Sequence, residues 1–205
     1  MTIENPHGVT VTLIAAVDEG GLIGVGNDLP WKCPVDHARF KRLTYYPPPT
    51  PGADSYSKPL ILGRTTFDCI FHKYGYVLPG RRLFVMSRKP MTELNKEIGF
   101  VRRTPEDALE MAAMYARSAA RSPGPVYQPP EVLVIGGAQV YKEFLPVADR
   151  VYLTTVDGTY GTGTGEDVYM PDLKAGDWKV AYQERFQGDI HGRPGHLFEV
   201  LVRRG

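Results

Sequence analysis

The sequence predicts an α/β fold in which a mainly parallel sheet is covered by helices on both faces. Short runs of β-branched and apolar residues alternate with segments of helical spacing through most of the chain, which is typical of successive β-α-β units. Several of these runs are apolar throughout, and strands of that kind are buried on both faces. The 205 residues suit one compact domain, so we expect residues 1–205 to form a single unit.

The N-terminal part justifies the first strand and the first helix. Residues 9–17 predict a strand covered on both faces, and the glycine-rich residues 19–29 predict a flexible loop. Pro34 suits a first helical position, and helical spacing follows to residue 45. Residues 46–57 are rich in proline and cannot continue a helix. We therefore expect a surface insertion there.

The rest of the chain predicts further strands and helices in alternation. Apolar runs predict strands over residues 59–62, 83–86, 98–101, 132–135 and 151–156. Segments of helical spacing predict helices over residues 64–70, 105–120 and 138–144. Residues 122–130 are rich in proline and glycine and predict a linker. Residues 178–186 and 196–203 alternate in polarity, which is typical of antiparallel strands near a sheet edge.

Composition excludes several classes of function. The formal net charge of +1 gives no electrostatic footprint for nucleic acid or for an anionic membrane. The two cysteines do not form a CxxC pair and the five histidines have no ligand spacing, so we expect free thiols and no metal site. No targeting segment and no apolar run long enough to span a membrane is evident. We expect a soluble cytoplasmic monomer.

Groups that suit phosphate recognition follow four of the predicted strands. Because the carboxyl ends of parallel strands meet at one edge of a sheet, these groups are expected to lie together. Cations, hydroxyls and free helix N–H groups are what phosphate oxygens need. The pattern is not GxGxxG, so a standard Rossmann site is not supported. The segments are Gly63-Arg64-Thr65-Thr66, Ser87-Arg88-Lys89, Arg102-Arg103 and Gly136-Gly137-Ala138.

Asp36 is the second candidate for a functional residue. An acid in a first helical turn is common because it complements the helix dipole, so this position alone does not mark a site. Asp36 also shares a helix face with Phe40 and Leu43, and a carboxylate on an apolar face is unusual. Trp31, just before the helix, would shield such a carboxylate from bulk water.

These motifs together resemble the dihydrofolate reductase family. Leu29-Pro30-Trp31, Pro34-x-Asp36 and Phe40-Lys41 are similar to its active-site signature. The resemblance extends over residues 10–204 and implies an eight-stranded, mostly parallel sheet with an antiparallel strand at its C-terminal edge and four flanking helices. The other matching segments are Ile14-Ala15-Ala16-Val17 with Ile23-Gly24, Gly63-Arg64-Thr65-Thr66, Leu78-Pro79-Gly80-Arg81, Ile135-Gly136-Gly137 with Val140-Tyr141, and Tyr152-Leu153-Thr154.

The resemblance implies an activity and a substrate site. The activity is reduction of 7,8-dihydrofolate to tetrahydrofolate with NADPH, which transfers a hydride to pterin C6 and a proton to N5 and supports one-carbon metabolism. Small-molecule antifolates are the implied inhibitors. Asp36 would hold the 2-amino group and N3, supported by Thr154, while Trp31 would hold an ordered water. The implied apolar walls are Ile14, Phe40 and Ile70, and Arg81 would pair with the glutamate tail.

The resemblance also implies the cofactor site. Arg64, Ser87 and Arg88 would hold the adenosine 2′-phosphate, with Arg102 nearby, and these cations favour NADPH over NADH. The nicotinamide end would contact Ala16 and a lid formed by Leu22, Ile23, Gly24, Val25, Gly26, Asn27, Asp28 and Leu29. The pyrophosphate would lie against Gly136, Gly137, Ala138, Gln139, Val140 and Tyr141, with further contacts from Gly63, Thr65, Thr66, Met86 and Ile135.

Two alternatives stay open at this point. A reductase of the riboflavin-biosynthesis type shares the implied fold and NADPH but acts on a ribose phosphate substrate, and a non-catalytic relative would only bind a ligand. Asp36 and Arg81 argue against the first, and intact Trp31 and Thr154 argue against the second. His37 and Arg39 depart from the family pattern, since many members have apolar or amide residues there.

Overall fold

The computed structural model describes residues 5, 8–45, 58–74, 78, 80–91, 99–120, 129–189 and 192–205. The insertion expected at residues 46–57 lies outside the described residues, as do residues 122–128 of the expected linker. None of the helices among the described residues is long and apolar enough to cross a membrane.

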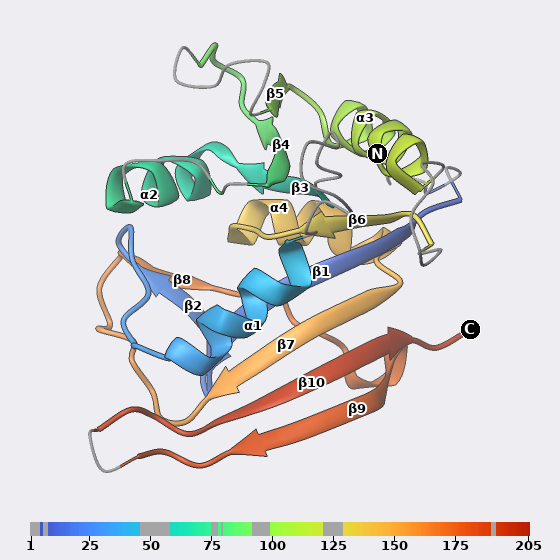
Figure 1. Cartoon of the computed structure of the whole chain (residues 1–205). Helices are drawn as coiled ribbons and strands as arrows, with labels where there is room; N and C mark the ends of the chain where they lie inside the picture. The colour runs from blue at the N-terminus through green and yellow to red at the C-terminus, as the bar shows by residue number, and fades with distance from the viewer. Residues whose placement is uncertain are drawn as a thin grey trace.

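The core of the molecule is an eight-stranded sheet with the order β5-β4-β3-β6-β1-β7-β10-β9, which runs from top to bottom in Figure 1. The strands β5, β4, β3, β6, β1 and β7, which are neighbours in this order, are all parallel. Strand β10 is antiparallel to both of its neighbours, β7 and β9. The strands span β1 Thr10–Asp18, β3 Lys58–Gly63, β4 Arg81–Met86, β5 Gly99–Arg102, β6 Glu131–Val134, β7 Arg150–Val156, β9 Trp178–Phe186 and β10 His196–Arg203.

This architecture confirms the fold predicted from the sequence. The C-terminal strand β10 runs antiparallel as expected and lies one position inside the edge, which β9 forms. Central strands such as β3 are buried along nearly their whole length, whereas most residues of β9 are exposed. The difference follows from position, because an edge strand has a neighbour on one side only.

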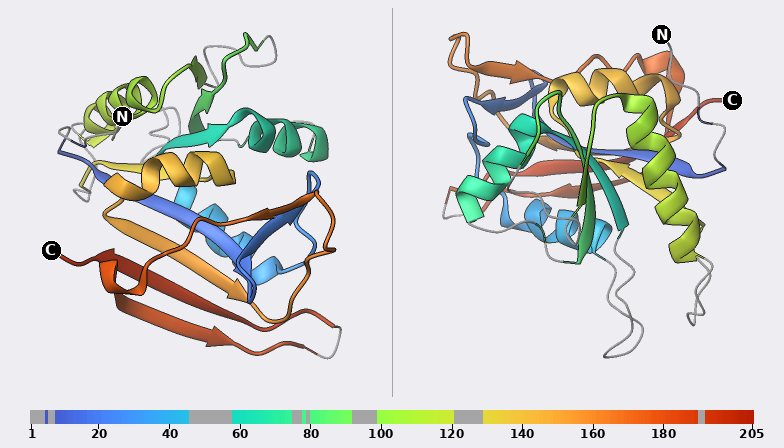
Figure 2. Two further views of the ribbon diagram at one scale, coloured as in Figure 1. Left: turned by 180° about the vertical axis from the view of Figure 1, so that it is seen from behind. Right: turned by 90° about the horizontal axis from the view of Figure 1, so that it is seen from above.

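Within the described part of the chain, four helices cover the two faces of the sheet. They are α1 Pro34–Thr44, α2 Arg64–Tyr74, α3 Pro105–Ala120 and α4 Ala138–Phe144, and two short 3₁₀ turns span Leu145–Val147 and Ala175–Asp177. Apolar residues of α3 and α4 belong to one core cluster, whereas those of α1 and α2 belong to another. Figure 2 shows α2 and α3 on opposite sides of β3 and β4.

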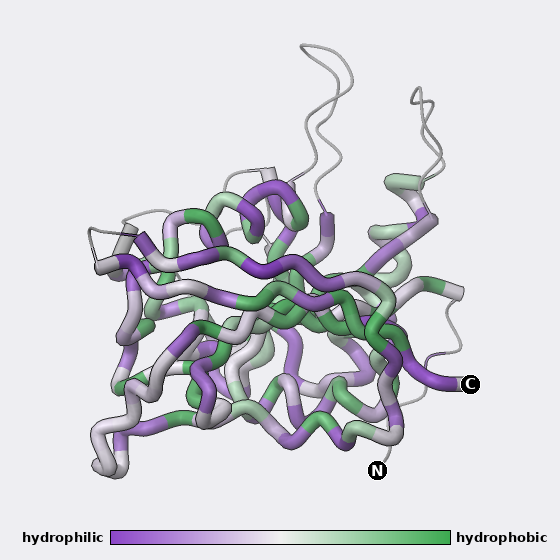
Figure 3. Tube along the Cα trace, turned by 90° about the horizontal axis from the view of Figure 1, so that it is seen from below, coloured by the Kyte–Doolittle hydropathy of each residue, from purple (hydrophilic) through white to green (hydrophobic). Residues whose placement is uncertain are grey.

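The helix boundaries follow from local chemistry. Pro34 occupies the first turn of α1, where its missing N–H has no cost. The Thr104 hydroxyl accepts a hydrogen bond from the backbone N–H of Asp107 and so caps α3. Colouring by hydropathy shows hydrophobic segments gathered towards the middle of the molecule (Figure 3).

A second, two-stranded sheet was not predicted. Within the expected loop of residues 19–29, β2 Leu22–Val25 pairs antiparallel with β8 Asp167–Tyr169. The buried carboxylate of Asp18 fixes this unit, because it accepts hydrogen bonds from the N–H groups of Gly20, Leu22 and Tyr160. The end of β1 therefore anchors both loops of the small sheet.

Candidate active site

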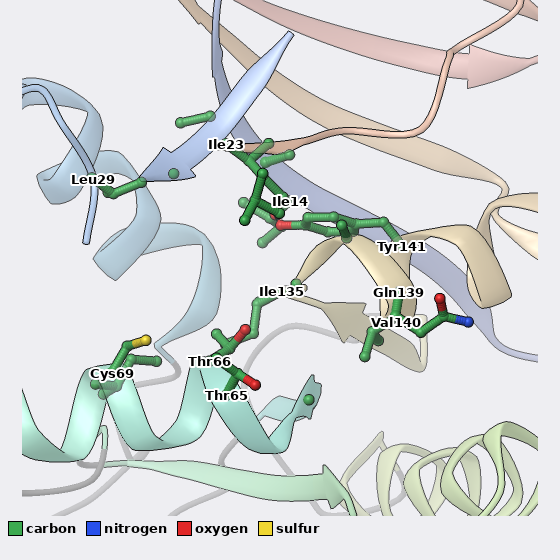
Figure 4. A pocket seen from close by; sticks show the side chains of 18 of the residues that line it. Ile14, Ile23, Leu29, Thr65, Thr66, Cys69, Ile135, Gln139, Val140 and Tyr141 are labelled. Carbon is green, nitrogen blue, oxygen red and sulfur yellow. The ribbon is translucent and has the colours of Figure 1, made fainter. Parts of the chain in front are cut away.

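A cavity of about 800 Å³ opens at the carboxyl ends of the central strands. That is where ligands bind in open α/β sheets, and the volume is ordinary for a small-molecule site. Gly63 and Met86, the last residues of β3 and β4, both line the cavity. Figure 4 shows that its walls come from β1, β2, α2 and α4, with side chains such as Ile14, Leu29 and Thr65 projecting into it.

One end of the cavity contains a carboxylate with a fixed direction. Asp36, in the first turn of α1, is half-buried and lines the cavity. Its Oδ1 accepts a hydrogen bond of 2.5 Å from the hydroxyl of Thr154 on β7. Phe40, one helical turn after Asp36, lines the same wall, and Ile14 and Ile70 add apolar surface from β1 and α2. The result is a hydrogen-bond acceptor at an otherwise apolar wall.

The opposite end is rich in cations and hydroxyls. Arg64, Thr65 and Thr66 begin α2, which has no acidic residue in its first turn, and the Arg64 guanidinium forms an ion pair of 2.8 Å with Asp68 one turn later. Arg88 and Arg103 line the same cavity after β4 and β5. Such a set is suited to a ligand with several phosphates.

The turn between β6 and α4 brings backbone close to this end. A Cβ on Gly137 would lie 3.3 Å from the Thr66 hydroxyl oxygen, and one on Gly63 would lie 3.2 Å from Cγ2 of Val140. A Cβ on Gly136, whose φ is +99°, would lie 2.8 Å from the Tyr141 ring. Glycine at these positions leaves room that any larger residue would fill. The peptide bond between Gly136 and Gly137 is cis.

Comparison with known proteins identifies the family. The family model described as "Dihydrofolate reductase" matches residues 10–203. The chain belongs to the dihydrofolate reductase family. It is 30% identical over 196 residues to the dihydrofolate reductase of Haemophilus influenzae. This alignment covers 96% of this chain and 100% of the relative. It is 32% identical over 194 residues to the type 3 dihydrofolate reductase of Salmonella typhimurium. That alignment covers 95% of this chain and 98% of the relative.

A solved structure supports the same assignment. The dihydrofolate reductase of Enterococcus faecalis, complexed with NADP(H) and RAB-propyl, superimposes with a TM-score of 0.73 at 25% sequence identity. The match covers 96% of this chain and 97% of that chain. The shared fold therefore extends over nearly all of both proteins.

Most of the residues expected from the resemblance line the cavity. Of the residues expected to contact the substrate, those in the lining are Ile14, Asp36, Phe40, Ile70 and Thr154. Of the residues expected to contact the cofactor, those in the lining are Ala16, Ile23, Gly24, Gly26, Asn27, Asp28, Leu29, Gly63, Arg64, Thr65, Thr66, Met86, Ser87, Arg88, Ile135, Gly137, Ala138, Gln139, Val140 and Tyr141.

Three expected positions of the lid and substrate region lie outside the cavity lining. Leu22 is fully buried and Trp31 is 6% exposed, and both pack against Val156 in a separate apolar cluster. Val25 packs against this cluster too. The β2–β8 pairing is irregular between Leu22 and Gly24, and Ile23 faces the cavity instead. Leu22, Val25 and Trp31 therefore pack in this cluster and do not line the cavity.

Three other expected residues also lie outside the lining. Arg102 folds back over the Phe100 ring, with its Cζ atom 5.2 Å from the ring centroid, whereas Arg103 lines the cavity. The reason is strand alternation, since Arg102 and Phe100 are two residues apart on β5. Arg81 is buried and donates hydrogen bonds to the Thr44 hydroxyl and the Lys41 carbonyl. Gly136 lies outside as well, where it accommodates the ring of Tyr141.

Sequence reasoning missed several lining residues. Tyr152 could have been found, because it lies two residues before Thr154 on β7 and so shares its face. Val168 and Phe198 could not, since only tertiary pairing brings β8 and β10 to the cavity. The missed set is Ala15, Cys69, Leu78, Pro105, Glu143, Tyr152, Val168 and Phe198, with His37 and Arg39 noted only as departures. Arg103, expected among the phosphate-binding groups, and Leu43, expected on the helix face of Asp36, both line the cavity.

Proposed function

We propose that Asp36 is the residue that holds the pterin ring of dihydrofolate while it is reduced. As a member of its family, the chain is an NADPH-dependent oxidoreductase that converts dihydrofolate to tetrahydrofolate. The observation that carries the proposal is the hydrogen bond from Thr154 to Asp36 at the apolar wall of the cavity. It fixes the orientation of a carboxylate that would bind a flat ligand in the cavity.

The hydrogen-bond acceptors of Asp36 and Thr154 match the donors of an amino-substituted ring. An ionised carboxylate only accepts hydrogen bonds, so Asp36 would take the 2-amino group and the N3 hydrogen of the pterin. The single proton of the Thr154 hydroxyl already goes to Asp36. Its oxygen is therefore left as an acceptor for the second hydrogen of the amino group. Ile14, Phe40 and Ile70 would pack against the ring system.

The cofactor end fits a dinucleotide phosphate. Arg64, Ser87, Arg88 and Arg103 would hold the 2′-phosphate, and the glycine turn at Gly137 leaves room for the pyrophosphate. Other contacts would come from Thr65, Thr66 and α4. When bound, NADPH supplies the hydride.

The lid and its surroundings would keep water out during the reaction. Ile23 and Leu29 project into the cavity from the β2 segment, and their apolar side chains would cover the reacting face. The proton that N5 gains would come from a water molecule, and the negative charge of Asp36 would raise the basicity of the ring. Exclusion of bulk water strengthens this electrostatic effect.

A steady-state assay tests the proposal. The purified chain should oxidise NADPH when dihydrofolate is added, as followed by NADPH absorbance. It should not do so with the ribityl-aminopyrimidine phosphate used by the riboflavin-type reductases of the same fold. Turnover of that second substrate alone, or of neither one, would contradict the proposal.

The proposal extends to assembly and location. We propose a monomer that acts in the cytoplasm without a nucleic acid or membrane partner, in keeping with its formal net charge of +1. Light scattering after size exclusion should give the mass of one chain, 22.8 kDa. A mass of two chains would contradict the proposed monomer without affecting the proposed activity.

A further inference from the structure

Arg39 is a buried cation on the wall of the substrate end. It is 5% exposed and lines the cavity from α1. Its guanidinium lies over two aromatic rings, with Cζ at 4.1 Å from the Phe198 centroid and 4.7 Å from that of Phe186. Stacking on both rings fixes the position of the charge.

The charge of Arg39 is only partly compensated. Nη2 forms an ion pair of 3.4 Å with Glu184, whose side chain is 45% exposed and therefore screened by solvent. Nη1 is buried and has no hydrogen-bond partner among the residues that the structure describes. His196, stacked on Phe186, adds no charge at neutral pH, because burial lowers its pKa below its ordinary value. A positive charge that is only partly compensated by Glu184 therefore lies at this wall.

This charge lies close to Asp36. The two residues are three positions apart on α1 and so share a face of the helix. Both line the same cavity. Any ring that binds Asp36 consequently enters the field of the Arg39 guanidinium as well.

We propose that Arg39 tunes the charge selectivity of the site by weakening its preference for rings that bind with a positive charge over neutral rings of the same shape. The inference rests on the proposed function, because it assumes that the ring binds at Asp36. A neutral ring interacts with Asp36 through hydrogen bonds and meets little repulsion from Arg39. A protonated ring gains attraction from Asp36 but loses part of it to the second charge.

Two ligands of nearly the same shape make the test sharp. Folate carries a neutral 2-amino-4-oxo ring, whereas methotrexate carries a basic 2,4-diamino ring that accepts a proton beside a carboxylate. Their tails are closely similar, so the ratio of their dissociation constants reports on the ring. The constants are measured for each variant by titration in the presence of NADPH.

Arg39→Met keeps most of the side-chain volume and removes the charge. We expect methotrexate to gain on the order of tenfold in affinity relative to folate, as for two charges about 6 Å apart at an effective dielectric constant near 20 to 80. Arg42→Met is the matched control, since Arg42 is exposed on the same helix and does not line the cavity. The control should leave the ratio unchanged.

For Glu184→Gln we expect the opposite change in the relative affinity for methotrexate. This variant also tests the inference if Arg39→Met fails to fold. It removes the partial compensation, so methotrexate should lose about two- to threefold relative to folate. Arg39→Lys should keep most of the selectivity. Equal changes for both ligands in Arg39→Met, or an unchanged ratio in Glu184→Gln, would overturn the inference.

Failure of the proposed function gives a different result. If the wild-type chain bound neither folate nor methotrexate, the assignment of Asp36 would fail before selectivity could be compared. If it bound both ligands and only the ratio failed to respond, the selectivity role of Arg39 alone would be wrong.

Discussion

The Thr154 hydroxyl fixes the direction of the carboxylate at the substrate end. Its hydrogen bond to Asp36 joins β7 to α1 at the cavity wall. Thr154→Val keeps the shape and removes the hydroxyl, so Asp36 loses a donor and the pterin amino group loses an acceptor. We expect KM for dihydrofolate to rise about five- to tenfold, the equivalent of one hydrogen bond. NADPH affinity should stay the same, and a loss of both affinities would contradict this role.

Cofactor specificity is a second question at the residue scale. Arg64→Ala removes a cation from the phosphate end, so we expect NADPH to lose on the order of tenfold to a hundredfold in affinity while NADH changes little. Arg102→Ala is the control, since Arg102 folds over Phe100 outside the cavity. The measurement is a titration of each variant with both cofactors. Equal losses for NADPH and NADH in Arg64→Ala would show that this residue does not bind the 2′-phosphate.

At the scale of elements, one buried carboxylate holds the β2 segment that we propose as the lid. Asp18 accepts hydrogen bonds from three backbone N–H groups on the two loops beside β2. Asp18→Ala leaves these donors without their acceptor, so we expect the free energy of unfolding to fall by about 1–3 kcal/mol. KM for NADPH should rise because Ile23 and Leu29 are held less firmly over the cavity. Denaturant unfolding and steady-state kinetics check both effects. An unchanged KM would show that Asp18 supports the fold without supporting the lid.

The small sheet shows which elements could not be predicted from sequence patterns. The longer elements were predictable, because the bounds of α3 and β9 follow directly from their periodicity and caps. Strands β2 and β8 are only four and three residues long and lie in glycine-rich segments. Their pairing joins residues far apart in the chain, and no local pattern specifies it.

At the scale of the whole molecule, His196 couples stability to pH. It is buried on β10, stacks on Phe186 at 4.6 Å and contacts the Cys33 sulfur at 3.4 Å. Burial lowers its pKa below 6.5, so the unfolded chain binds a proton more readily than the folded chain. The stability from neutral His196 is therefore complete above pH 6.5 and is lost as the pH falls towards the folded pKa.

The corresponding experiment compares unfolding at two pH values. Wild-type protein should lose up to about 1.4 kcal/mol per pH unit below the ordinary histidine pKa from this group. His196→Phe should remove that part of the dependence, whereas His72→Gln should keep it because His72 is exposed. The same acid dependence in His196→Phe and wild type would show that other groups are responsible.

The candidate site was predictable to the extent that strand ends and helix faces define it. Asp36, Thr154 and Arg64 were all expected at the cavity and lie there. The exceptions concern direction: Arg102 and Arg103 are adjacent in sequence, and the packing of Arg102 on Phe100 leaves Arg103 as the one that lines the cavity. Position along a chain predicts which segment reaches a site, but packing decides which side chain enters it.

The role of Asp36 is the central claim, and one variant tests it most directly. Asp36→Asn keeps the shape of the side chain and removes its charge. We predict that turnover of dihydrofolate at neutral pH falls by about 100-fold or more, while NADPH binds nearly as tightly as to wild type. If Asp36→Asn turned over dihydrofolate at the wild-type rate, the carboxylate would have no part in the reaction and the account would be wrong.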